Sequence, residues 1–347
     1  MVELRLKGPQ IASDLGAVSA SAGAADDSIQ VPSFLKPSAL TGLPRISDGF
    51  DTDTLTLDTT GLTGITAYDW RIAGGATQGT APTLSGAGLG GQWIECAVTC
   101  DQGTLVAPAV MVYASSHMGM TMAASHMTDD RAVVALVPHA EMTHIALADG
   151  NWNDTTIWAG GKVPKNGACV LIPHGVTVTY NEADRYRLDR VRVDGTLTWA
   201  LGQSTYMLVE TMVGTRGSSI IIGTSSNRVP AAYTHEIIVS GKDYSTNSYV
   251  KTELQLARDA RLWGRGIVSQ GLWRMWGTEK RTWGYADPID AGATSLTMRD
   301  TPTGWQVGDT IVIAGTYVNY PGGGHPLTVQ DEERVITGVN GNAISWS

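Results

Sequence analysis

Between residues 168 and 240, short apolar segments recur along the chain, and each is bounded by Gly, Asp or Ser. The segments are ACVLIPHGVTVTY, RVRVDGTLTW, SSIIIGTSS and HEIIVSG. Each apolar run has about five residues, the length of an ordinary β-strand. Short strands joined by glycine turns are typical of stacked coils, in which each rung buries one face on the rung below. The pattern therefore predicts a coil-like β domain.

The composition favours the same fold class for the rest of the chain. The 347 residues include 41 Gly and 11 Trp but only two Phe, and charged residues make up 16%. A Gly-rich, charge-poor chain with many β-branched residues is typical of an all-β protein with many tight turns. We therefore predict an all-β fold.

The net charge of −9 limits the partners that the chain can bind. Nucleic-acid binding requires a basic face, and an acidic protein is repelled by anionic membrane surfaces. No apolar run reaches the roughly 18 residues that a membrane span needs. We expect no nucleic-acid partner and no membrane insertion.

The two ends of the sequence give further expectations. The opening residues, MVELRLKGPQIASDLG, lack the basic and then apolar segments of a secretory signal. This favours a protein that acts from the cytoplasm or leaves the cell by another route, such as lysis. The final residues, ISWS, are typical of an interior strand and not of a cap, so we expect the natural chain to continue past Ser347.

The first 147 residues divide into three parts. Residues 1–44 mix small polar residues with prolines, which indicates an extended arm ordered by a partner or, alternatively, a floppy terminus. Residues 45–114 contain the alternating strands DTLTLDTT, AYDWRI, QWIECAVTC and TLVAPAVMVYA at the spacing of a β-sandwich. Residues 115–147 form a linker or junction, in which RAVVALVPHAEMTHIAL is strand-like.

Residues 45–114 resemble the bacterial immunoglobulin-like modules of phage virion and cell-surface proteins. The resemblance depends on Trp70 as a core indole and on IECAVTC, the later strand with Cys96. Leu55 and Leu57 stand where such a module has its first Cys, so the core disulfide is absent. Such modules usually space or bind and rarely catalyse. The chain has three Cys in all, too few for a disulfide scaffold, and we expect buried thiols.

A second resemblance covers residues 148–260. The ordered features are Trp152, Trp158, GKVP, NGACVLIPHG, VDGTLTW and IIIG. They resemble the eight-glycine (G-eight) domain of hyaluronidase-like proteins, of fibrocystin, and of bacterial and phage proteins. The resemblance implies a coil-like domain that often caps a right-handed parallel β-helix, with no catalytic residue assigned to the domain itself.

Residues 261–347 resemble the segment that comes after this domain in its family. The strand around Trp305, Val307, Gly308 and Asp309 leads into a Glu-rich turn and then a strand pair across Asn340-Gly341. The resemblance implies that residues 261–347 are the start of a right-handed parallel β-helix.

A tryptophan- and arginine-rich segment supplies the candidate binding residues. These are Trp263, Trp273, Trp276, Trp283 and Arg274. Tryptophan rings stack on the faces of pyranose sugars, and Arg bonds hydroxyls or carboxylates, so the segment predicts a carbohydrate-binding face. The alternative is packing at a subunit or domain seam, with Arg stacked on Trp.

Two sets of possible metal ligands are discounted. Asp149, Asn151 and Asn153 imitate the first ligands of a calcium loop, but Asp154 and Gly160 stand where that loop needs Gly and Glu. A capped turn is favoured there. His139 and His144 have no paired Cys or carboxylate at zinc-site spacing. We predict no metal and no cofactor.

Two possible catalytic groups are discounted as well. His174 lies in a Pro-His-Gly turn that the family pattern explains. Asp331 and Glu333 could share one strand face as a glycosidase pair, but a solvated turn is favoured. We predict no catalytic residue in this sequence, and a polysaccharide depolymerase activity would reside in a C-terminal continuation.

Together these patterns favour a structural component of a phage tail, a tail fiber or tail spike. By that resemblance we expect a homotrimer in the virion that attaches to other tail proteins through residues 1–44 and presents a β-helical part to host surface polysaccharide. The alternatives are a secreted or surface-attached, hyaluronidase-like protein that binds or degrades polysaccharide, and a bacterial adhesin.

Overall fold

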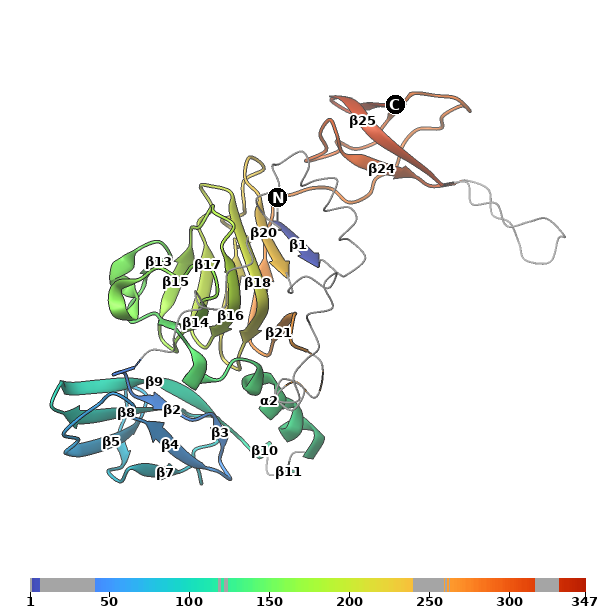
Figure 1. Ribbon diagram of the computed structural model, residues 1–347. Helices are drawn as coiled ribbons and strands as arrows, with labels where there is room; N and C mark the ends of the chain where they lie inside the picture. The colour runs from blue at the N-terminus through green and yellow to red at the C-terminus, as the bar shows by residue number, and fades with distance from the viewer. Residues whose placement is uncertain are drawn as a thin grey trace, which may run out of the picture. The chain divides into compact units, whose positions relative to one another are not determined.

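A computed structural model describes residues 2–6, 41–117, 120–121, 124–239, 259, 261, 263–315 and 331–347. These residues fall into two compact units, Met1–Gly277 and Thr278–Ser347. Among them, the only α-helix is α2 (Ala124–Leu136), and nearly all other regular structure is β (Figure 1). The prediction of a mostly β protein is confirmed.

The first part of the first unit is a pair of small sheets, here called the sandwich. One sheet has the strand order β2-β4-β7, with bounds Arg45–Ile46, Thr54–Asp58 and Thr83–Ser85. The other has the order β3-β9-β8-β5-β6, with bounds Gly49–Phe50, Gly103–Tyr113, Trp93–Cys100, Ala67–Ile72 and Thr77–Gly79. All pairs are antiparallel except β3 with β9. After them, β10 (Ser116–His117) and β11 (Met120–Thr121) form a short antiparallel pair.

The sandwich core comes from the alternation that the sequence shows. In β8, Ile94, Cys96 and Val98 are fully buried, because alternate residues of a strand face the same side. Trp70 of β5 lies directly opposite Cys96, and its indole N–H donates to the Ala81 carbonyl at 2.8 Å. That bond satisfies the one polar atom of a buried indole.

The second part of the first unit is a parallel two-sheet coil, here called the coil. Its first sheet has the order β1-β20-β18-β16-β14-β12, with bounds Val2–Leu6, His235–Val239, Thr205–Gly214, Arg187–Val193, Cys169–Ile172 and His144–Ile145, and β21 (Ile267–Ser269) also pairs with β18. Its second sheet has the order β13-β15-β17-β19-β22, with bounds Gly150–Asn151, Thr177–Tyr180, Thr196–Trp199, Ser219–Ile222 and Leu272–Met275. From β12 to β19 the chain alternates between the two sheets, so each rung contributes one strand to each (Figure 1).

The coil core is built from equivalent positions of successive rungs. Val178, Leu197, Ile220 and Trp273 stand in register across β15, β17, β19 and β22, and the first three are fully buried. An aromatic cluster of Trp152, Trp158, Tyr180 and Trp199 extends the same core, with neighbouring ring centroids 5.0–5.9 Å apart. Stacking of like positions explains why each short segment needs its neighbours to bury its apolar face.

The turn after β16 requires glycine. A Cβ built on Gly195 would lie 2.1 Å from the Pro173 carbonyl oxygen and 2.4 Å from that of Val176. Both oxygens belong to the backbone of the preceding rung, so neither can move aside like a flexible side chain. The glycine therefore allows one corner of the coil to sit directly on the next.

Helix α2 corrects the expectation that RAVVAL is strand-like. Asp130, Val133, Val134 and Val137 are buried, a spacing of three and four residues that matches a helix. The six apolar residues in succession, 132–137, fit a buried strand and a buried helix segment equally well, so the sequence pattern did not distinguish them. The 3₁₀ turn η3 (His139–Glu141) connects α2 to β12, whereas η4 (Thr155–Ile157) and η5 (Ala159–Gly161) lie between β13 and β14.

The expected N-terminal arm, residues 1–44, is described only in part. Residues Val2–Leu6 form β1, which pairs in parallel with β20, Val2 standing opposite His235. Residues 7–40 of the expected attachment region lie outside the described residues.

The second unit is an antiparallel sheet, not a continuation of the parallel coil. Its order is β23-β26-β25-β24, with bounds Ser295–Thr297, Ala343–Trp346, Glu332–Asn340 and Thr310–Ile313. β25 and β26 meet across Gly341, and so short a connection can join only antiparallel strands. Within 261–347, where we expected the start of a parallel β-helix, the described parallel strand pairs therefore end at β22, and only a single parallel bridge from Val229 to Gly277 follows it.

Candidate functional site

The predicted carbohydrate-binding residues divide between the two units. In the first unit, Trp263 packs against the cluster beneath α2, and Trp273 packs against the coil core. Trp276 stacks with Arg228, whose guanidinium carbon lies 5.1 Å from the ring centroid, and Arg274 is exposed on β22. Trp283 belongs to the second unit and is 62% exposed.

Three arginines of the same segment have acidic partners. Arg261 pairs with Asp129 at 2.7 Å, Arg265 with Glu210 at 3.7 Å, and Arg281 with Asp300 at 2.7 Å. In the first unit, the Arg228–Trp276 stack and the ion pairs of Arg261 and Arg265 are contacts of the kind that the packing alternative expects. Of the predicted tryptophans, Trp283 is the one that presents most of its ring to solvent.

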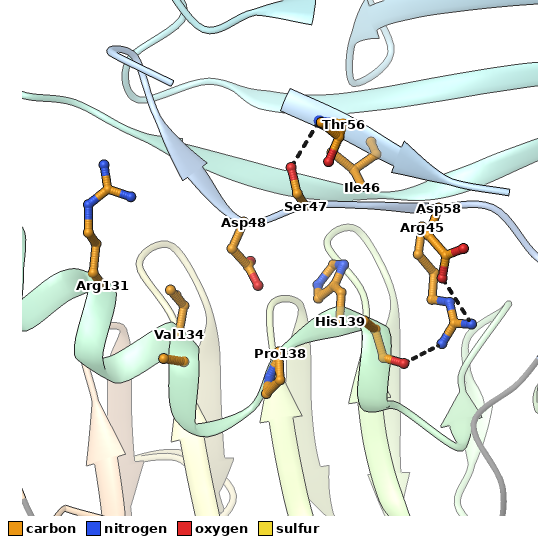
Figure 2. Close-up of a pocket in the computed structure, with 12 residues that line it drawn as sticks. Arg45, Ile46, Ser47, Asp48, Thr56, Asp58, Arg131, Val134, Pro138 and His139 are labelled. Atoms are coloured by element: carbon orange, nitrogen blue, oxygen red, sulfur yellow. Dashed lines mark hydrogen bonds and ion pairs between the residues drawn. The ribbon is translucent and has the colours of Figure 1, made fainter. Parts of the chain in front are cut away.

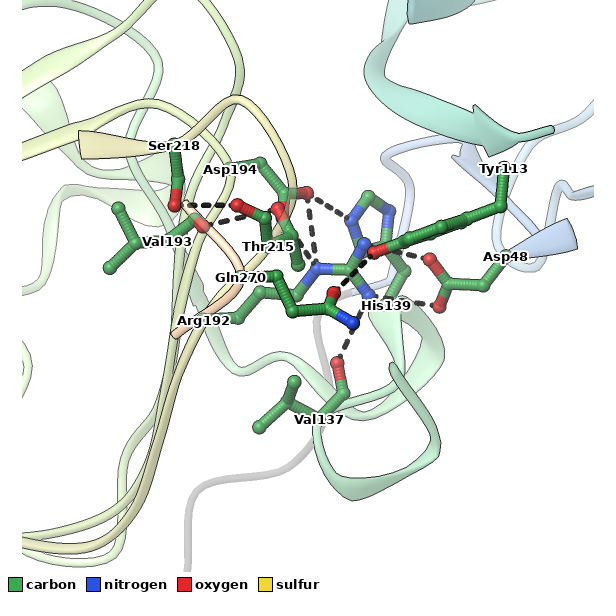
Figure 3. A network of polar contacts seen from close by, with 10 residues as sticks. All are labelled: Asp48, Tyr113, Val137, His139, Arg192, Val193, Asp194, Thr215, Ser218 and Gln270. Carbon is green, nitrogen blue, oxygen red and sulfur yellow. Dashed lines mark hydrogen bonds and ion pairs between the residues drawn. The ribbon is translucent and has the colours of Figure 1, made fainter. Parts of the chain in front are cut away.

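A buried ionic cluster lies where the sandwich meets the coil, the boundary here called the seam. Figure 3 shows Arg192 of β16 between two carboxylates. Its Nη1 and Nη2 donate to both oxygens of Asp48, at 2.9 and 2.7 Å, and its Nε donates to Asp194 at 2.9 Å. Asp48 follows β2 of the sandwich, whereas Asp194 directly follows β16 of the coil. One side chain therefore binds the two parts together.

The location of Arg192 follows from strand alternation. Val191 and Val193 face the coil core, so Arg192 between them points out of the coil. It is nevertheless only 1% exposed, because the sandwich and the segment after α2 cover that face. A guanidinium without water is tolerated only when it is fully paired, and the two carboxylates meet that condition.

Both carboxylate oxygens of Asp194 make further hydrogen bonds. Thr215 donates its hydroxyl to Oδ1 at 2.7 Å, and His139 Nε2 lies 3.0 Å from Oδ2 (Figure 3). An ionised Asp194 only accepts, so His139 Nε2 is the donor of this hydrogen bond. Burial opposes ionisation of Asp194, but Arg192 and His139 outweigh it and hold the pKa of Asp194 well below its usual range.

The same balance acts on the guanidinium. Burial alone would lower the pKa of Arg192, but the charges of Asp194 and Asp48 outweigh burial and raise that pKa. Arg192 and Asp194 are therefore held in their ionised forms across the ordinary pH range. A group held in one protonation state is suited to structural bonding and not to proton transfer.

A second set of polar contacts connects α2 with the seam. Asp130 of α2 accepts from Arg216 at 2.9 Å and from Gln270 at 2.7 Å. Tyr113, at the end of β9 in the sandwich, donates to Gln270 at 3.2 Å, and Arg216 lies over its ring. An ion pair and neutral hydrogen bonds thus join helix α2 and the sandwich to the coil.

A cleft of about 440 Å³ opens beside the cluster, between the sandwich and the segment that contains α2 and η3 (Figure 2). Its lining residues are Arg45, Ile46, Ser47, Asp48, Thr56, Asp58, Arg131, Val134, Ala135, Pro138, His139 and Ala140. Arg45 donates to the Ala140 carbonyl at 2.9 Å, and Arg131 pairs with Asp53 at 2.8 Å. The charged groups at the cleft thus bond to the protein itself and bridge its two walls.

The comparisons with known proteins concern the coil. Residues 157–284 match the G8 domain. The match covers β14 to β22, and therefore includes Arg192, Asp194 and Trp273. It agrees with the resemblance seen in the sequence, although the G8 match begins later and ends beyond residue 260. Comparison with curated proteins and with solved structures found no significant match.

In the G8 segment and the residues just before it, the discounted sites have ordinary structural contacts. Asp149 accepts the Thr177 N–H at 2.7 Å, and Asp154 accepts the Thr156 N–H at 2.8 Å as the cap of η4. His174 stacks on Trp93, and His144 bonds Thr143 at 2.8 Å. The capped turn predicted for the loop with Asp149, Asn151 and Asn153 is confirmed, and the capping residue is Asp154.

Burial bears on two other expectations. Cys96, Cys100 and Cys169 are free and buried, as predicted. Asp331, Glu332 and Glu333 are exposed, but the expected solvated turn is wrong for two of them, because Glu332 and Glu333 begin β25 and pair with Ile313 and Val312 of β24. Within the described parts of the chain, no group of three His, Cys, Asp or Glu side chains could hold a metal ion, and no helix has the length and apolar character to cross a membrane.

Sequence reasoning missed the seam cluster. The only available signal was the segment RVRVDG, in which Arg192 alternates with apolar residues and precedes Asp194. Arg on the outward face of a strand is ordinarily solvated. The partner that removes it from water, Asp48, is 144 residues away in sequence, which no local pattern reveals.

Proposed function

We propose that the chain is a structural component of a phage tail, a tail fiber or tail spike. In this proposal it attaches to other tail proteins through residues 1–44 and presents a receptor- or polysaccharide-binding part to the host surface. The supporting observation is the seam, where buried Arg192 bonds Asp48 on one side and Asp194 on the other. Two β modules joined through fixed charges form a stiff spacer, which suits a part that must hold a binding surface at a set orientation.

We further propose that the sandwich is an immunoglobulin-like module. Trp70 lies opposite Cys96 in the buried core, and Leu55 fills the position of a first Cys. A module without a core disulfide is compatible with folding in a reducing cytoplasm.

The coil, in this proposal, is of the right-handed parallel β-helix type. Its two sheets are parallel, and successive strands alternate between them. Crossover connections between parallel strands are right-handed in nearly all proteins. Among the described residues, β22 is the last strand of its sheet, and Leu272 and Met275 on it are exposed. An open strand edge of this kind favours assembly with further chains, and we propose a homotrimer.

Density-gradient fractionation of the producing culture tests the tail assignment, with the protein detected by mass spectrometry. We expect it to co-sediment with tailed particles. Recovery with cell envelopes would replace the proposal with a bacterial adhesin. Recovery as a free protein that releases reducing sugar from capsular polysaccharide would replace it with a hyaluronidase-like enzyme.

A further inference from the structure

Trp283 and Tyr285 form an exposed aromatic corner in the second unit. Each is 62% exposed, whereas Trp70, Trp152 and Trp158 are almost completely buried. The two rings are 5.4 Å apart between centroids, and their planes meet at 87°. The pair therefore offers two flat apolar faces at a right angle to each other.

The backbone beneath the corner is fixed by hydrogen bonds. Arg281 Nε donates to the Trp283 carbonyl at 2.9 Å, and the Arg299 N–H donates to the Tyr285 carbonyl at 2.8 Å. Between the two aromatics, a Cβ on Gly284 would come within 2.4 Å of Met298 Cε, so the backbone packs closely on the layer below. A surface that is already ordered binds without a further loss of conformational entropy.

Polar groups flank the two rings in balanced pairs. Arg281 pairs with Asp300 at 2.7 Å, and Arg299 approaches Asp287 at 3.5 Å. Each pair contributes N–H donors and carboxylate acceptors, and at least one member of each is more than half exposed. Hydroxyl groups both donate and accept hydrogen bonds, so they match such mixed pairs. A polyanion, in contrast, would be repelled by the carboxylate that each pair contains.

We propose that Trp283 and Tyr285 bind a neutral pyranose unit of a polysaccharide. One ring stacks on the apolar C–H face of the sugar, the second closes its edge, and the flanking pairs bond its hydroxyls. The net charge of −9 also disfavours an acidic glycan or a nucleic acid as occupant. This inference rests on the proposed function in assigning the chain a polysaccharide receptor, and it restricts the predicted Trp set to Trp283 and adds Tyr285.

Affinity electrophoresis tests the site with the full chain. Native gels contain dextran, galactomannan or laminarin as neutral polymers, or polygalacturonate as an acidic one, and a single-stranded DNA oligomer is tested by mobility shift. We expect retardation by at least one neutral polymer, weakened about tenfold or more by Trp283→Ala and by Tyr285→Ala. Trp283→Phe should retain part of the binding because it keeps an aromatic face. Val307→Ala is the matched control, since Val307 is an exposed apolar residue of the same unit.

The proposal is overturned if none of the neutral polymers retards the protein, or if Trp283→Ala and Tyr285→Ala bind as the parent does. Binding to polygalacturonate or DNA alone also overturns it. Thermal unfolding of each variant verifies the fold, which exposed side chains should not alter. The tail assignment is tested separately by co-sedimentation with particles, which neither substitution should affect, so failure of one proposal is distinguishable from failure of the other.

Discussion

Trp93 of the sandwich stacks on His174 of the coil, with ring centroids 4.1 Å apart and planes within 10° of parallel. Trp93 begins β8, and His174 occupies the Pro-His-Gly turn between β14 and β15. Burial at this contact lowers the pKa of His174. The turn therefore contributes to the seam, a role that its place in the family pattern did not suggest.

Removing the Trp93 ring should release His174. We expect Trp93→Ala to move the pKa of His174 upward, because the ring that shields the imidazole from water is gone. The loss of stacking should cost about 1 kcal/mol in the free energy of unfolding. An NMR titration of the histidine ring protons measures the pKa. Gln92→Ala, at the exposed neighbouring position, is the control, and an unchanged His174 titration in Trp93→Ala would contradict the stack.

Asp48→Ala should be strongly destabilising. It leaves two nitrogens of the buried Arg192 guanidinium without their carboxylate, and an uncompensated buried charge typically costs about 3–5 kcal/mol. The control is Asp69→Ala, which removes an exposed partner of Arg71 inside the sandwich and should have little effect. Urea unfolding followed by tryptophan fluorescence compares them. Equal midpoints for the two variants would show that the seam does not contribute to stability.

Gly195→Ala should destabilise the coil by about 3 kcal/mol or more, because the new Cβ would overlap two backbone oxygens of the previous rung. Gly202→Ala is the matched control, since a Cβ there has no neighbouring atom within 4 Å. Circular dichroism during heating gives both melting temperatures. If Gly195→Ala and Gly202→Ala have the same melting temperature, the turn after β16 is not packed against the preceding rung as described.

Acid should weaken the first unit between pH 6.5 and 4. Burial lowers the pKa of His144 and of His235 to about 4, from an ordinary value of 6.5. In this window the unfolded chain binds more protons than the folded one, so stability falls as pH falls. Each histidine should account for on the order of 1–3 kcal/mol.

Urea unfolding at several pH values, with His144→Gln and His235→Gln, measures this dependence. Each substitution should flatten the slope between pH 4 and 6.5. His126→Gln, on an exposed helical position, should leave the slope unchanged. A parent protein whose stability is constant across the window would refute the assignment.

The three thiols should be unreactive in the folded protein. Cys96, Cys100 and Cys169 are buried, and burial raises the pKa of Cys96 to about 11, so little thiolate is present at neutral pH. Ellman's reagent should label none of them under native conditions and all three in denaturant. Rapid native labelling would contradict the packing of the sandwich and coil cores.

The sequence predicted features that depend on local alternation. The strands around Trp70, Val178 and Ile220 were predictable because buried residues recur at every second position and Gly marks the turns. Helix α2 was missed, since its apolar run has no unique period. The strand pair across Asn340-Gly341 was predicted and is confirmed, but we had assigned it to the start of a parallel β-helix, whereas its sheet is antiparallel.

The candidate site depended on distant residues and was only partly predictable. Trp283 was identified from its aromatic, arginine-rich surroundings. Its partner Tyr285 was overlooked because a single Tyr carries no pattern of its own. The Arg192–Asp48 pair joins segments far apart in sequence, and only the folded chain brings them within bonding distance.

The seam also limits how the parts of this protein can be exchanged. A different sandwich placed before this coil would leave Arg192 buried without an acid unless it provided one at the place of Asp48. A different coil placed behind this sandwich would in turn need a cation on the outward face of the strand equivalent to β16. Recombination between related genes that cuts between residues 48 and 192 therefore separates a charge from its counter-charge, whereas a cut after Gly277 leaves the pair intact. Viable chimeras should be those that inherit the sandwich and the coil as one block.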